Sequence, residues 1–175
     1  MPLKKPNEIP KIPKTRRKSI SALKKAIPLK KKTEIEFEVR FFFKYDGALR
    51  KQFYVIFINT IKEFSYLNYE VAVEVARNKD VIDISLQGLN MKHSYLVEPR
   101  SAYKELLFED LYGEYTINLI KQDGSINTAI LNFNIFKKEM ALVAEKIPPK
   151  KNNSRFCTFI IEKDYFTFQK SETKK

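Results

Sequence analysis

Hydrophobic and polar residues alternate most clearly between residues 112 and 136. The incoming half, residues 114–121, has the period of two that is typical of a strand with one buried face. The pair Asp123-Gly124 follows, and such a pair favours a two-residue type I′ turn between antiparallel strands. The return half, residues 126–135, alternates again. The stretch is therefore predicted to form a β-hairpin around which the remaining strands are arranged.

The same signal predicts strands on both sides of this hairpin. Asp46-Gly47 repeats its turn chemistry, and Gly88 and Asn90 are predicted to end the strand that begins at Val81. The ranges with alternating, β-branched or aromatic composition are 34–45, 52–58, 69–76 and 81–87, together with a C-terminal hairpin made of 156–161 and 165–168.

Two segments are ambiguous. Residues 101–110 contain alternating apolar positions but also suit a helical turn, and strand is preferred because every neighbouring segment is one. Residues 136–147 have apolar positions at helical spacing, and Pro148-Pro149 would stop such a helix. Helix and strand are therefore both left open for 136–147.

The number and spacing of these strands indicate the fold class. About eight short strands with turns at regular intervals are typical of an all-β sandwich or barrel. We predict an antiparallel β-sandwich of about eight strands, immunoglobulin-like or jelly-roll-like. Residues 33–147 would form the sandwich, and residues 148–175 a C-terminal hairpin packed on the same domain with a short basic tail.

The positive charge is concentrated at one end of the chain. The whole sequence has 33 Lys and Arg against 21 Asp and Glu, a formal net charge of +12. Residues 1–32 hold 12 of the basic residues and one acidic residue, Glu8, which amounts to +11. The remaining 143 residues hold 21 basic and 20 acidic side chains. The basic character therefore belongs to an N-terminal arm.

The arm has a composition that disfavours a packed core. It holds five of the eight prolines and no aromatic residue, so it is predicted to be disordered when free. Ile20, Leu23 and Ile27 have helical spacing, which indicates a short helix that could form on a partner. The candidate nucleic-acid-binding residues are its clustered cations, Arg16, Arg17, Lys18, Lys24, Lys25, Lys30, Lys31 and Lys32.

The sequence offers little material for catalysis. His93 is the only histidine, and it stands in a predicted loop without a second His or Cys at ligand spacing, which argues against a zinc site. Cys157 is the only cysteine and lies in an apolar strand, where a thiol is typically a buried hydrophobe. The four glycines stand apart at turns and form no phosphate-binding loop. We expect no enzyme activity, no cofactor and no metal.

One stretch resembles a known family over residues 111–131. The residues that carry the resemblance are Leu111, Gly113, Tyr115, Ile117 and Leu119, followed by Asp123-Gly124 and an alternating strand. They resemble the last two strands of immunoglobulin-like and fibronectin type III-like sandwiches. In that family a tyrosine near the start of the sixth strand ties back to the preceding corner, and Tyr115 occupies the matching place. The resemblance implies a sandwich fold.

These observations favour a non-enzymatic binding protein whose basic arm, residues 1–32, docks a β-sandwich on RNA or DNA within an assembly. One alternative is a protein–protein interaction module of immunoglobulin-like type, in which strand edges or loops bind a partner. Another is a virus-like shell subunit. A protein partner and a cytoplasmic location are expected, because no apolar run reaches the length of about 20 residues that crosses a membrane. Strand order, ligand identity and oligomeric state are left open.

Overall fold

A computed structural model of the chain describes residues 34–92, 98–134, 136–137, 139–149 and 153–162. All of them belong to the second of two units into which the chain divides, residues 32–175. They form nine strands and no helix: β1 Phe37–Asp46, β2 Lys51–Phe64, β3 Asn68–Asn78, β4 Val81–Lys92, β5 Arg100–Phe108, β6 Gly113–Lys121, β7 Ile126–Asn134, β8 Glu139–Lys146 and β9 Cys157–Ile161. The predicted all-β class is confirmed.

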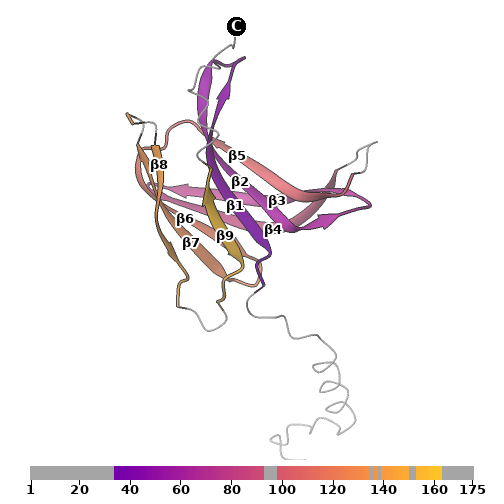
Figure 1. Cartoon of the computed structure of the whole chain (residues 1–175). Coiled ribbons are helices and arrows are strands. Elements are labelled where there is room, and N and C mark those ends of the chain that lie inside the picture. Colours follow the sequence, from indigo (N-terminus) through magenta and orange to yellow (C-terminus); the bar gives the residue numbers. More distant parts are fainter. Residues whose placement is uncertain (1–33, 93–97, 135, 138, 150–152, 163–175) are drawn as a thin grey trace, which may run out of the picture. The chain divides into compact units, whose positions relative to one another are not determined.

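The strands form one continuous sheet that is nearly closed into a barrel (Figure 1). Their order is β8-β7-β6-β4-β3-β5-β2-β1-β9. Most neighbours are antiparallel, but β4 and β6, β3 and β5, and β1 and β9 pair in parallel. The predicted sandwich of about eight antiparallel strands is therefore not confirmed. Parallel pairing joins strands that are distant in sequence, and no local turn signal encodes it.

The hydrophobic core lies on one face of this curved sheet, because alternate side chains of each strand point the same way. Every strand supplies at least one buried hydrophobic side chain to this core. The largest fully buried side chains are Phe41, Phe133, Phe156, Ile56, Ile58, Ile82, Ile84, Leu111, Ile117, Leu119, Leu131 and Val39. The half-buried faces that alternation predicted therefore meet in a single core.

Replacing Ile117 by alanine should destabilise the protein by roughly 2–5 kcal/mol, the usual cost of a large-to-small core substitution. Ile117 is 1% exposed and lies between Ile82 of β4 and Ala129 of β7, which are themselves fully buried. The cavity that the substitution leaves could therefore not open to solvent. Urea denaturation of the two proteins measures the difference. A change below about 0.5 kcal/mol would place Ile117 on the surface.

Of the two alternatives left open for residues 136–147, the structure has the strand, because β8 occupies this segment and pairs antiparallel with β7. Of the four apolar positions at helical spacing, only Met140 is buried. Phe136, Val143 and Ile147 are 86%, 55% and 46% exposed. The helical spacing therefore came mainly from surface residues. The strand predicted for 101–110 is confirmed by β5.

The turn of the central hairpin also differs from the prediction. A type I′ turn needs positive φ at both central residues, but of Asp123-Gly124 only Gly124 has one, at 77°. The Gly124 N–H donates to the Lys121 carbonyl at 2.8 Å, and the Lys121 N–H donates to the Ser125 carbonyl at 2.9 Å. The Asp123 carboxylate accepts a hydrogen bond from the Ser125 N–H at 2.9 Å, which favours this longer loop over the predicted two-residue turn.

Two strand ends also depart from their predicted positions. The strand that begins at Val81 continues past Gly88 and Asn90 to Lys92, so the predicted end is wrong. Gly88 has a φ of 135° and stands at a bulge opposite Ala72, which lets the strand bend and go on. At the C-terminus, β9 pairs with β1, and the predicted partner strand at 165–168 lies outside the described residues.

Candidate functional site

The predicted nucleic-acid-binding residues cannot be placed. Arg16, Arg17, Lys18, Lys24, Lys25, Lys30, Lys31 and Lys32 all lie outside the described residues, and so does His93. What the structure does place is the charged surface of the sheet unit. That surface decides whether the sheet unit itself could hold a polyanion.

Ion pairs occupy most of the cations on the sheet unit. The described residues include 14 Lys and Arg side chains against 18 Asp and Glu side chains. Eight of these cations lie within 4.0 Å of a carboxylate oxygen, namely Arg40, Lys44, Lys51, Arg77, Lys92, Lys104, Lys121 and Arg155. A phosphate would have to displace a carboxylate at each of them. The described surface is therefore a poor site for a polyanion.

Glu70 of β3 illustrates this pairing. Its carboxylate accepts a hydrogen bond from the Lys104 ammonium at 2.5 Å and lies 3.3 Å from the Lys92 ammonium. These two cations, Lys104 first, hold the pKa of Glu70 below its usual value. Lys92 also lies 5.6 Å from the centre of the Tyr103 ring. Strands β3, β4 and β5 are thus tied together where β3 and β5 share only one bridging pair.

Arg77 joins the end of β3 to the connection between β5 and β6. Its guanidinium donates two hydrogen bonds to the Asp110 carboxylate, at 2.8 and 3.0 Å, and a third to the Tyr115 hydroxyl at 2.9 Å. Hydrogen bonding to Arg77 lowers the pKa of Asp110. Tyr115 therefore binds a side chain of another strand through its hydroxyl. This fixed, structural geometry leaves Arg77 little freedom to bind a ligand.

Side-chain amides join β7 to the segment that leads into β9. The Asn127 side chain of β7 accepts hydrogen bonds from the N–H groups of Phe156 and Cys157 at 2.9 and 3.1 Å, and it donates to the Ser154 carbonyl at 2.9 Å. The Asn153 side chain likewise accepts a hydrogen bond from the Ile126 N–H and donates one to the Ile126 carbonyl. Because an amide carries the same donor and acceptor as a peptide group, these side chains replace a missing strand partner.

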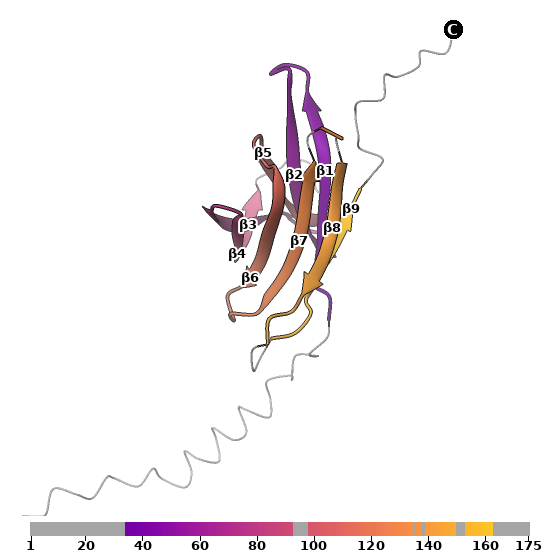
Figure 2. The same ribbon diagram turned by 90° about the vertical axis from the view of Figure 1, so that its left-hand side faces the viewer.

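An ion pair supports the same closure. Arg155 and Glu145 lie 2.6 Å apart between the start of β9 and the end of β8. Figure 2 shows β7, β8, β9 and β1 side by side at this closure. We call the region formed by Asn127, Asn153, Arg155 and Glu145 the seam. Backbone groups already satisfy the two amides, and the ion pair satisfies Arg155 and Glu145, so the seam is a structural device and not a ligand site.

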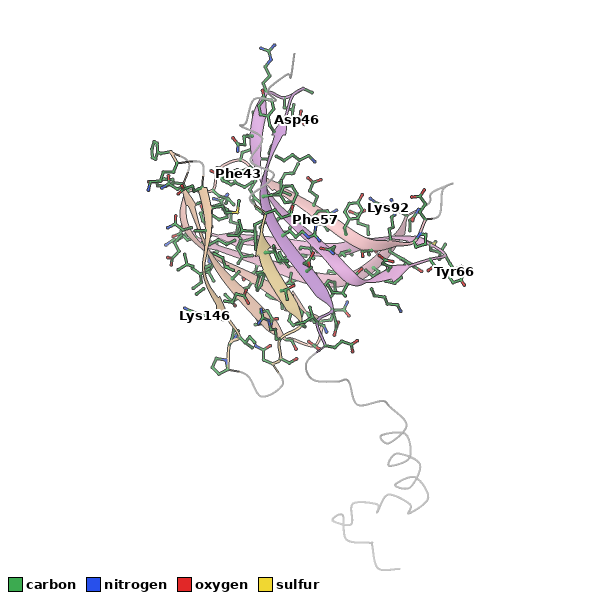
Figure 3. The ribbon with its side chains drawn as sticks, in the orientation of Figure 1. Phe43, Asp46, Phe57, Tyr66, Lys92 and Lys146 are labelled. Carbon is green, nitrogen blue, oxygen red and sulfur yellow. The ribbon has the colours of Figure 1, made fainter. Side chains whose placement is uncertain are left out.

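A row of aromatic side chains crosses the outer face of the sheet. The ring of Phe57, which Figure 3 labels, stacks on that of Tyr103 with centroids 5.4 Å apart, and the Phe42 ring centroid lies 6.3 Å from that of Phe57. The row follows the order β1-β2-β5, so sequence reasoning missed it: β5 is not adjacent to β2 along the chain. Phe42, which interrupts the polar face of β1, was its only local signal. Ring neighbours and Lys92 already occupy the flat faces, which disfavours base stacking there.

The described part of the chain contains no constellation of side chains suited to catalysis. No group of three or more His, Cys, Asp or Glu side chains in it could hold a metal ion. Cys157 is 1% exposed, and burial raises the pKa of its thiol to about 12. The thiol is therefore protonated at neutral pH, which agrees with the interpretation of Cys157 as a core residue and not a nucleophile.

The native Cys157 thiol should react with iodoacetamide roughly a thousand times more slowly at neutral pH than the same thiol in urea. The raised pKa lowers the thiolate fraction by about three orders of magnitude, and burial also blocks access. Mass spectrometry over a time course measures both rates. Equal rates in the folded and unfolded protein would show that Cys157 is exposed.

Comparison with known protein families, curated proteins and solved structures gives no match. The resemblance of residues 111–131 to immunoglobulin-like sandwiches therefore stays a prediction. In the described residues, no helix has the length and apolar composition needed to cross a membrane. The functional argument thus depends on the chain's own charges, edges and surfaces.

Proposed function

We propose that this protein is a non-enzymatic binding protein whose residues 1–32 attach the sheet unit to a polyanion, RNA or DNA, within a larger assembly. The division of charge carries the proposal. Residues 1–32 have a net charge of +11, whereas the described residues have 14 cations against 18 carboxylates. Clustered Lys and Arg side chains gain affinity for nucleic acid by releasing the counterions that surround its phosphates.

The recognition should be indifferent to nucleotide sequence. Contacts between cations and phosphates position a protein on a nucleic acid but do not read the bases. Base-edge readout needs amide, guanidinium or carboxylate groups held in fixed geometry within a groove. The arm is predicted to be disordered when free, so it offers its charges without such a geometry. Affinity is therefore expected to depend on phosphate density and salt.

Deleting residues 1–32 tests the proposal. Fluorescence anisotropy would compare the full chain and residues 33–175 on labelled RNA and DNA at low salt. We expect the truncated chain to bind at least about 100-fold more weakly, because phosphate contacts dominate affinity. Its thermal unfolding should be nearly unchanged. A truncated chain that binds as tightly as the full chain would place the polyanion site on the sheet unit.

A second candidate, the protein-interaction module, has support from one region of the surface. Apolar side chains gather where β2 ends, β3 begins and β4 ends: Tyr66, Leu67 and Met91 are 88%, 41% and 51% exposed. Figure 3 shows Tyr66 and Lys92 at this end of the sheet. Exposed apolar groups that gather in one place are typical of binding surfaces. This candidate moves to first place if neither form of the chain binds nucleic acid at low salt.

The third candidate, a shell subunit, makes a different prediction. Such a subunit assembles with itself into large particles, and light scattering of the full chain detects them directly. A cationic arm is compatible with all three candidates. The charge division favours the polyanion proposal over the shell, because binding a polyanion does not require the chain to assemble with itself.

A further inference from the structure

The end of β4 is an open strand edge with apolar side chains. From Val81 to Leu86 this strand pairs with β6 on the side away from β3. The Gln122 amide then donates a hydrogen bond to the Gln87 carbonyl. Beyond that point, in the part of the chain that the structure describes, no strand pairs with residues 88–92 on that side, although β3 pairs with them on the other. We call residues 88–92 the β4 edge.

Side chains bridge parts of the other open edges of the sheet. The seam joins β7 and β8 to the segment that begins β9, through Asn127 and through the ion pair between Arg155 and Glu145. The gap between β3 and β5 is spanned by the bond from Lys104 to Glu70. Proteins commonly block an exposed strand edge with such charged groups. The β4 edge differs because its own charged residue, Lys92, turns to Glu70 and Tyr103 on β3 and β5.

Alternation along the β4 edge gives it one apolar face. Leu89 and Met91 are 39% and 51% exposed, and they pair with Val71 and Tyr69. Paired residues in a sheet share a face, so both side chains lie on the face that carries the core. Gly88, Asn90 and Lys92 lie on the opposite face. The edge therefore offers unpaired backbone groups together with an apolar stripe, which are the two features that a docking strand uses.

The sequence of the β4 edge is complementary to itself. In an antiparallel pair centred on Asn90, Leu89 of one copy lies opposite Met91 of the other, and Gly88 lies opposite Lys92. The four apolar side chains then form one cluster on one face. No like charges stand opposite each other, which such pairing requires. A two-fold axis through the two Asn90 residues generates this arrangement, as in the common isologous dimers.

We propose that the β4 edge is a self-association site at which a second copy of this chain pairs antiparallel about Asn90, joining two sheets into one. The inference develops the protein-interaction candidate and does not depend on polyanion binding, because all of its residues lie in β4. A five-residue edge buries less area than the standard interface of roughly 1,600 Å². The dimer should therefore be weak and should dissociate on dilution.

Light scattering coupled to size exclusion measures the first expected result. The mass of the full chain should rise from 20.7 kDa toward twice that value as the protein concentration increases. The double variant Leu89→Lys/Met91→Lys should stay at the monomer mass, because charge on both apolar positions opposes edge pairing. Both positions are exposed, so folding should be retained, as circular dichroism would check. The control variant Val143→Lys changes an exposed residue of the edge strand β8, and this variant should still form the dimer.

A disulfide tests the register. Paired residues of antiparallel strands have Cα atoms about 4.5–5.5 Å apart, within the range that a disulfide spans. Under mild oxidation, Asn90→Cys should form a covalent dimer at least about tenfold faster than Val143→Cys, since pairing raises the effective concentration of the thiols. The natural Cys157 is buried and should not interfere. A chain that stays monomeric at all concentrations, or equal cross-linking rates for the two variants, would overturn the proposal and leave a strand of a different protein as the occupant of the edge.

Discussion

Raising the salt concentration from about 50 to about 200 mM should weaken binding of the full chain to RNA or DNA by about 10³–10⁵-fold. The arm has enough cations for about six to ten phosphate contacts, and each contact contributes a slope of about −0.9 on duplex DNA and −0.7 on single strands. The logarithm of affinity should therefore fall linearly with the logarithm of salt concentration. Anisotropy titrations at several salt concentrations give the slope.

Removing cations from the arm should make the salt slope shallower in proportion to the number of cations removed. Replacing Arg16, Arg17 and Lys18 by alanine should make it shallower by about two to three, because each phosphate contact contributes roughly one. The matched control replaces three cations of the sheet unit that form no ion pair in the described structure, Arg50, Lys79 and Lys137. The control slope should equal that of the natural chain. If both triple variants change the slope equally, the sheet unit shares the binding.

Replacing Asn127 by alanine should destabilise the sheet unit by roughly 3–6 kcal/mol. The change leaves the N–H groups of Phe156 and Cys157 and the Ser154 carbonyl without their partner, and each buried polar group left unsatisfied costs about 1–3 kcal/mol. Urea denaturation measures the loss. Because β9 lies at the seam, the variant should also expose Cys157 and accelerate its alkylation in the folded protein.

Asn132→Ala is the matched control for this prediction. Asn132 lies on the same strand as Asn127 but is exposed, so its loss should change stability by no more than about 0.5 kcal/mol. The two variants remove the same chemical group from β7 and differ in what that group binds. Similar stabilities for the two variants would contradict the role of Asn127 in closing the seam.

Strand positions could be predicted from the sequence because they depend on local alternation. Residues 34–45 and 114–121 alternate almost without exception, and the structure places β1 and β6 there. Each such strand packs one face on a core, and the period of two records that burial directly. The same reasoning could not decide between helix and strand for residues 136–147, where exposed Phe136, Val143 and Ile147 imitate a helical stripe.

The pairing of the strands could not be predicted, because it depends on contacts between distant segments. Val81 lies opposite Thr116 in the parallel pair of β4 and β6, and Phe37 lies opposite Cys157 in that of β1 and β9. Neither pair of strands is joined by a turn whose residues could have predicted the pairing. The seam was unpredictable for the same reason. A single Asn127 in a hydrophobic strand has no local feature that identifies its partner at residue 156.

The candidate site could likewise be predicted only in part. The cationic arm was visible in the sequence because charge is a sum over residues and needs no structure. The ion pairs that occupy the sheet unit's cations, such as Arg77 with Asp110, became visible only with the strands in place. The same holds for the β4 edge, which exists because β6 turns away from β4 after Leu86.

A synthetic peptide of residues 1–32 tests the central claim most directly, since the claim is that the arm carries polyanion binding and the sheet unit does not. The peptide, the full chain and residues 33–175 would be titrated against the same labelled RNA at several salt concentrations. The account predicts that peptide and full chain share one salt slope, while residues 33–175 bind at least about 100-fold more weakly. A peptide that does not bind, beside a full chain that does, would contradict the account.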